Sequence, residues 1–185
     1  MDQKLIFHNT FIDSLLLVEP TVSSDERGNF YRLFCKEEFK NIGISMDIKQ
    51  INISFNKFRG TLRGLHYQSS PSTEAKIIRC SQGEIFDVAV DIRKNSKTYL
   101  SFFSINLSSK NKFMLFIPNG FMHGFQTLNN NVYVEYYHSD FFMKELDNGI
   151  FYKDKTLNIQ WPFKVTNISE RDKELPVINE RFEGV

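Results

Sequence analysis

The chain has 185 residues, enough for one well-buried core and too few for two, so a single domain over residues 1–185 is expected. Its 23 lysines and arginines balance 22 aspartates and glutamates, and the formal charge of +1 argues against non-specific binding to nucleic acid or membranes. No stretch reaches the roughly 18 apolar residues that a membrane span needs. Cys35 and Cys80 lie far apart without a CxxC spacing, which favours reduced thiols in a cytoplasmic protein.

Short apolar or alternating runs recur between turn signals along the chain. In order they are FIDSLLLVEP, FYRLFC, IKQINISF, LRGLHY, KIIRC, EIFDVAVDI, YLSFFSINL, KFMLFIP, FMHGFQTL and VYVEYYH. Their spacing of about 8 to 12 residues is typical of an all-β sandwich or barrel. One short helix is predicted at residues 36–43, where Gly43 provides a C-terminal stop. Residues after about 145 are expected to form turns and small helices outside the sheet.

The run EIFDVAVDIR alternates cleanly, which predicts a strand with two distinct faces. Asp87 lies between Ile85 and Ala89 on one face and is expected to be partly enclosed. Asp91 and Arg93, near the strand end, are expected to face solvent.

In VYVEYYH, period two sends Tyr136 inward with Val132 and Val134. By the same period Arg63 and His66 should point to opposite sides of their strand. Because a glycine inside a strand often marks a bulge, Gly64 predicts a bend that turns both cationic side chains toward one cavity.

Of the four histidines, His66 and His123 are the central candidates for a metal site. His8 lies near the chain start, and His138 lies near the end of a predicted strand. A metal site in a barrel commonly combines two or three histidines with a carboxylate, often as His-x-His, but Gln68 stands two residues after His66. The histidine set falls short, and no metal is expected.

Nucleophilic catalysis has weak support, because there is no GxSxG elbow and neither cysteine has a histidine nearby in sequence. An acid/base site remains: the chain offers a histidine, an inward tyrosine, cations to hold an anion and carboxylates to orient an imidazole. The residue types alone leave both such a site and a packed core open.

Six motifs, in register, resemble the dTDP-4-dehydrorhamnose 3,5-epimerase family. They are DERGNF (25–30), TLRGLHYQ (61–68), EAKIIRC (74–80), GEIFDVAVDIRK (83–94), IPNGFMHGF (117–125) and SERDKELP (169–176). The resemblance implies a cupin-like jelly roll that works as a homodimer without metal or cofactor, with N-terminal strands within about residues 1–50 contributing to the partner subunit. It also implies an enzyme that inverts C3 and C5 of a nucleoside diphosphate-4-keto-6-deoxy sugar, most simply dTDP-4-dehydro-6-deoxyglucose, through an enolate.

By this resemblance His66 corresponds to the catalytic base, and Asp172 to the carboxylate that hydrogen-bonds its ring. Tyr136 corresponds to the proton donor on the other face of the sugar. Lys76 is expected to stabilise the enolate oxygen, and Asp87 is expected to pair with Lys76 and hold it in place.

The resemblance assigns further positions to the nucleotide end of the substrate. They are Arg27, Arg63 and His123 for the diphosphate, Gln50 and Asn52 as polar contacts, and Phe30 beside the base. Arginine suits this task because its planar fork binds phosphate oxygens bidentately. Phe30 is expected to come from the neighbouring subunit, and His123 could instead hold a turn.

Two positions depart from the family pattern. Arg32 stands where many members carry a glutamate near the base, which leaves guanosine or cytidine open beside thymidine. Phe142 occupies a position that is commonly tyrosine, which leaves open a C3-only or C5-only epimerase, or another sugar such as a GDP-linked hexose or a heptose. Readings from other classes are a metal-dependent cupin and a non-catalytic sugar-binding barrel.

Overall fold

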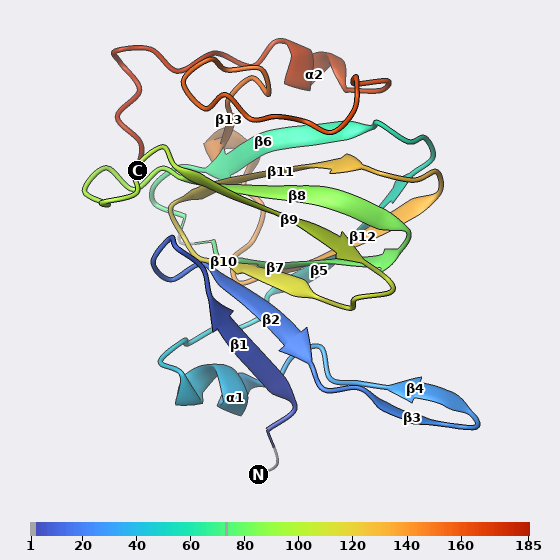
Figure 1. Cartoon of the computed structure of the whole chain (residues 1–185). Coiled ribbons are helices and arrows are strands. Elements are labelled where there is room, and N and C mark those ends of the chain that lie inside the picture. Colours follow the sequence, from blue (N-terminus) through green and yellow to red (C-terminus); the bar gives the residue numbers. More distant parts are fainter. Residues whose placement is uncertain (1–2, 73) are drawn as a thin grey trace.

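In the computed structural model, which describes residues 3–72 and 74–185, two antiparallel β-sheets pack as a sandwich (Figure 1). The six-stranded sheet has the order β1-β2-β10-β7-β12-β5, formed by Leu5–Asn9, Leu16–Pro20, Met114–Ile117, Lys76–Gln82, Val132–His138 and Gln50–Asn56. The five-stranded sheet has the order β13-β6-β11-β8-β9, formed by Asp147–Gly149, Leu62–Gln68, Phe121–Thr127, Glu84–Asp91 and Phe102–Ser108. This architecture confirms the expected all-β, cupin-like jelly roll.

The remaining elements are small and peripheral. They are the hairpin of β3 (Ser23–Asp25) and β4 (Gly28–Phe30), helix α1 (Lys36–Asn41), a 3₁₀ turn (Lys144–Leu146) and helix α2 (Glu170–Lys173). Helix α1 confirms the predicted helix, and Gly43 follows it with a φ of +84°, a left-handed conformation that favours glycine. Figure 1 shows the β3–β4 hairpin projecting away from the sandwich. In the described part of the chain, no helix has the length and apolar character that crossing a bilayer requires.

The core between the sheets is built from the inward side chains of alternating strand positions. Val132 and Val134 of β12 share this core with Ile85 and Ala89 of β8, as period two predicts. Tyr136 packs against the same core two residues further along β12, which confirms its predicted inward position.

A second apolar layer covers the outer face of the five-stranded sheet. Val88 and Val90 of β8 pack there with Leu157 and Trp161 of the C-terminal segment, which is orange to red in Figure 1. Strand β8 is therefore buried on both faces.

Three segments differ from the expectation from sequence. In the run FYRLFC only the first residue belongs to a strand, because Leu33 and Phe34 pack as a loop against the core beneath α1. Residues 5–9, which the apolar runs did not include, form β1 by pairing with β2. Residues 147–149 add a short strand to the edge of the sheet beside β6.

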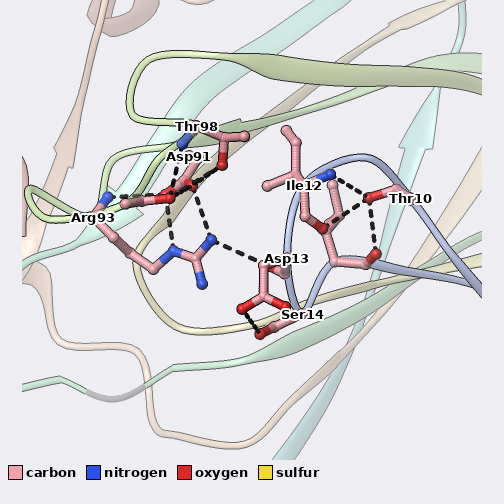
Figure 2. A network of polar contacts seen from close by, with 9 residues as sticks. Thr10, Ile12, Asp13, Ser14, Asp91, Arg93 and Thr98 are labelled. Atoms are coloured by element: carbon pink, nitrogen blue, oxygen red, sulfur yellow. Dashed lines mark hydrogen bonds and ion pairs between the residues drawn. The ribbon is translucent and has the colours of Figure 1, made fainter.

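Asp91 does not face solvent as expected, because its side chain is fully buried. Its carboxylate accepts hydrogen bonds from the Arg93 guanidinium and from the hydroxyls of Ser96 and Thr98. Arg93 also donates, at 3.1 Å, to the carbonyl oxygen of Asp13 in the loop between β1 and β2 (Figure 2). One buried carboxylate thus ties the end of β8 to the loop that follows it and to the N-terminal strand pair.

Replacing Asp91 by asparagine is expected to lower the free energy of unfolding at pH 7 by about 2 kcal/mol. Burial alone would raise the pKa of this carboxyl, but hydrogen bonds from Arg93, Ser96 and Thr98 outweigh it and lower the pKa to about 2. A depressed pKa contributes stability above pH 4 that disappears as the pH falls toward 2. Urea denaturation should therefore show a difference in the free energy of unfolding between wild type and Asp91→Asn that is smaller at pH 3 than at pH 7.

Asp47→Asn is the matched control. The Asp47 carboxylate also has a pKa lowered to about 2, by hydrogen bonds from Lys36 and Lys49, but these side chains are exposed. Because solvent screens surface ion pairs, this variant should unfold almost as the wild type does. Equal losses in the free energy of unfolding of the two variants would show that the burial of Asp91 does not strengthen its contribution to stability.

Candidate active site

A cavity of about 740 Å³ lies between the two sheets, within the size range of small-molecule sites. Strands β5, β7 and β12 of the six-stranded sheet form one wall. Strands β6 and β11 of the other sheet, together with residues 167–172 around the start of α2, form the opposite wall. A ligand in this cavity would therefore have one sheet on each of its faces.

The backbone around Gly64 explains how two cationic side chains of β6 reach this cavity. Gly64 has a φ of +112°, and a Cβ atom there would lie 2.6 Å from the Cα of Gly124 on β11. The register between β6 and β11 shifts at this point. As a result Arg63 and His66 both line the cavity, which confirms the predicted bend.

His66 and Asp172 form a hydrogen-bonded pair in the wall made by the five-stranded sheet and α2. The Nε2 atom of His66 lies 2.8 Å from Oδ1 of the buried Asp172, whose Oδ2 accepts from the backbone N–H of Gly64 at 3.1 Å. Burial raises the pKa of Asp172, but hydrogen bonds, chiefly from His66, lower it overall, so the carboxyl is ionised. A carboxylate only accepts, so Nε2 carries the hydrogen and Nδ1 is the basic atom of the ring.

Tyr136 lies on the opposite wall, in β12 of the six-stranded sheet. Its hydroxyl lies 3.4 Å from the Ser54 hydroxyl, and burial raises the pKa of the phenol well above its ordinary value. The phenol is therefore neutral at neutral pH and can donate a proton. A base and an acid thus face the same cavity from different sheets.

The partners of Lys76 and Asp87 correct one prediction. Lys76 does not pair with Asp87; its Nζ lies 2.8 Å from Oε2 of Glu74. Asp87 lies on β8 in the other sheet, where Oδ1 bonds Nε2 of His123 at 2.8 Å. Its second oxygen has no hydrogen-bond partner among residues 3–72 and 74–185. The two residues therefore have different partners, Glu74 for Lys76 and His123 for Asp87.

The family model described as dTDP-4-dehydrorhamnose 3,5-epimerase matches residues 9–180. The chain belongs to this family. A dTDP-4-dehydrorhamnose 3,5-epimerase from Shigella flexneri is 42% identical over 164 residues, covering 88% of this chain and 90% of that protein.

Solved structures of the epimerase family share the fold. The dTDP-4-dehydrorhamnose 3,5-epimerase of Elizabethkingia anophelis superposes with a TM-score of 0.92 at 33% identity, covering 97% of this chain and all of that one (100%). The Legionella pneumophila dTDP-6-deoxy-D-glucose-3,5-epimerase, solved in complex with dTDP-4-keto-L-rhamnose, gives a TM-score of 0.89 at 38% identity. The match covers 94% of this chain and 92% of that one.

Most of the site residues expected from the epimerase resemblance come together in the cavity. Those that line it are His66, Lys76, Tyr136, Asp172, Asn52, Arg63 and His123. Gln50 does not line it; its Oε1 accepts from the backbone N–H of Phe142, which does, at 2.9 Å. Asp87 lies behind His123.

Three positions expected to bind the nucleotide end of the substrate lie elsewhere in this chain. Arg27 and Phe30 belong to the β3–β4 hairpin, which projects from the sandwich in Figure 1. The Phe30 side chain is 80% exposed. Arg32 is paired with the buried Glu38, which also accepts from the backbone at the start of β1. No wall of the cavity in the described residues includes these three side chains. The assignment of Arg27 to the diphosphate, and of Phe30 and Arg32 to the base, stays a prediction.

Reasoning from the sequence missed Glu74 and His138, which both line the cavity. The signal for His138 was its position two residues after Tyr136, on the same face of the same strand. Glu74 stands in the motif EAKIIRC, two residues before Lys76. In the described part of the chain, no three metal-ligating side chains gather in a group that could hold a metal ion.

Proposed function

We propose that this epimerase inverts C3 and C5 of dTDP-4-dehydro-6-deoxyglucose to give dTDP-4-dehydrorhamnose. The observation that carries the proposal is the pair of opposed groups in one cavity: the carboxylate-bound His66 on one sheet and the neutral Tyr136 on the other. The C4 ketone of such a sugar acidifies the hydrogens on both neighbouring carbons. Epimerisation needs a base on one face of the ring and an acid on the other.

In the proposed first step, Nδ1 of His66 removes the proton from a carbon next to the ketone. The electron pair of the C–H bond moves to the C4 oxygen and gives an enolate, while Asp172 stabilises the imidazolium that forms. Lys76 supplies a cation for the enolate oxygen, and donors of this kind contribute about 3 to 4 kcal/mol to comparable oxyanion sites.

In the second step, Tyr136 donates its phenolic proton to the same carbon from the opposite face, which re-forms the ketone and inverts the centre. The phenolate regains a proton from solvent, and His66 releases the one that it took. The same two groups act again at the second carbon. No redox change occurs, and His66, Tyr136 and Lys76 supply the proton transfers at carbon and the countercharge in these steps.

Phe142 supports a second candidate, an epimerase that inverts C3 alone or C5 alone. Its side chain lines the cavity but brings no hydroxyl. A tyrosine at this position would add a polar group beside the sugar, so its absence bears on how protons reach the two carbons.

We also propose that the chain works as a homodimer in the cytoplasm, in which residues within about 1–50 complete the partner's nucleotide site. The exposed β3–β4 hairpin with Arg27 and Phe30 supports this. Edge strand β5 adds exposed Ile51, Ile53 and Phe55, an apolar row that is typical of an interface. Free thiols at Cys35 and Cys80 suit the reducing cytoplasm. A monomeric mass in sedimentation equilibrium would overturn the dimer.

The test of the function is incubation with dTDP- and GDP-linked 4-keto-6-deoxy sugars in deuterated water, followed by NMR. Deuterium and inversion at both carbons of the dTDP sugar support the 3,5-epimerase. Deuterium at one carbon alone supports the second candidate. A preference for the GDP-linked sugar would show that the substrate carries GDP and not dTDP. Binding without exchange would indicate a sugar-binding barrel, and loss of activity on chelation would indicate a metal-dependent cupin.

A further inference from the structure

Glu74 joins two other side chains in the cavity wall. Its Oε2 lies 2.8 Å from Nζ of Lys76, and its Oε1 lies 2.7 Å from Nδ1 of His138. All three side chains are nearly buried and line the cavity. Lys76 and His138 lie directly opposite each other on the paired strands β7 and β12, so one carboxylate clamps a cross-strand pair.

The clamp fixes which nitrogen of His138 carries the hydrogen. Burial would raise the pKa of Glu74, but the hydrogen bond from His138 and the charge of Lys76 lower it to about 2, so the group is an ionised acceptor. Nδ1 of His138 must therefore donate, which leaves Nε2 as the ring nitrogen that can carry a lone pair. The side-chain amide of Asn52 donates to this lone pair over a long 3.4 Å, so a substrate hydroxyl would have to take the place of that amide.

The ring of His138 also lies against the proposed proton donor. It stacks on the ring of Tyr136 with centroids 5.9 Å apart and an angle of 10° between the planes. This acceptor nitrogen lies beside Tyr136, which acts on the sugar carbon, on the side of β12 that faces β5, while Lys76 lies on β7 at the other side. An acceptor suits a hydroxyl of the sugar and does not suit a phosphate oxygen, which would need a donor.

We propose that His138 contacts the substrate, accepting a hydrogen bond from a hydroxyl group of the sugar ring, and that Glu74 is the positioning residue that holds His138 and Lys76. The proposal rests on the proposed function, because it takes the ligand to be a keto sugar attacked by His66. This hydrogen bond would fix the orientation of the sugar ring relative to the Tyr136 hydroxyl. Loss of this orientation should slow proton delivery by Tyr136 more than proton removal by His66.

The test compares His138→Phe, His138→Gln and Glu74→Gln with the wild type. His138→Phe keeps an aromatic ring for Tyr136 but removes both nitrogens, so kcat/KM should fall about ten-fold or more. The ratio of inverted product to deuterium exchange should fall as well. His138→Gln offers an amide oxygen as acceptor and should recover part of both. The double variant His138→Phe with Glu74→Gln should have a kcat/KM no lower than that of the less active single variant, because the two residues act as one unit.

Glu183→Gln is the matched control for Glu74→Gln, because Glu183 forms an exposed ion pair with Lys94 at 3.2 Å, outside the cavity. It should keep wild-type rates. The inference is overturned if wild type exchanges deuterium while His138→Phe and Glu74→Gln stay within two-fold of it with an unchanged ratio. Should His138→Phe fail to fold, an unchanged ratio in Glu74→Gln overturns it equally. Absence of exchange in the wild type would instead remove the proposed function itself.

Discussion

His66→Ala is expected to stop deuterium exchange at both C3 and C5 and to lower kcat by about 10²- to 10⁴-fold, the usual contribution of a general base. The reason is that Nδ1 of His66 is the free basic atom of a ring whose other nitrogen is bonded to Asp172. Without it, no proton leaves either carbon and no enolate forms. The measurement is NMR of the sugar in deuterated water, with KM determined alongside.

Asp172→Asn tests the same pair without removing the base. The asparagine amide can donate to Nε2, which would move the ring hydrogen to Nδ1 and turn the lone pair away from the substrate. A large loss of kcat with little change in KM is expected, as in the serine-protease example of a wrong tautomer. A folded His66→Ala protein that still exchanged deuterium at the native rate would place the base elsewhere.

Tyr136→Phe is expected to separate exchange from inversion. His66 can remove a proton and return a deuteron on the same face, so exchange should continue. Inversion needs a donor on the other face, and loss of the Tyr136 hydroxyl should lower formation of the inverted product by about 10²- to 10⁴-fold. One NMR time course gives both quantities, because deuterated starting sugar and inverted product have distinct signals.

Tyr133→Phe provides the control on the same strand. Tyr133 lies three residues before Tyr136, faces outward and is 38% exposed, so loss of its hydroxyl should leave both exchange and inversion unchanged. If Tyr136→Phe inverted the sugar at the wild-type rate, the proton from the second face would have to come from another group or from water.

Period two in the sequence was sufficient to predict which residues share a face, but it could not show what covers that face. Tyr136 and Asp87 are enclosed as predicted. Asp91 differs from the expectation because a charged residue at a strand end is usually exposed, whereas here a loop with Ser96 and Thr98, which carries no strand period, covers it. The prediction of a strand at residues 30–35 is wrong, because side chains of this apolar run pack against α1 from a loop.

The candidate site depends on pairings between distant segments. The bend at Gly64 could be predicted locally, since glycine within a strand has a direct backbone consequence. The pairing of Glu74 with His138 depends on the register of β7 with β12, which no local pattern encodes. The partnership of His66 with Asp172 spans 106 residues, and only the family resemblance indicated it.

That spacing also sets an order of events while the protein is being made. Every strand of both sheets precedes α2 in the chain, so the sandwich can assemble on the nascent polypeptide before Asp172 has left the ribosome. Until then the ring of His66 lacks the carboxylate that fixes its tautomer, and the cavity lacks the part of its wall formed by residues 167–172. The pair of His66 and Asp172 can therefore form only after the strands that frame the cavity have been made.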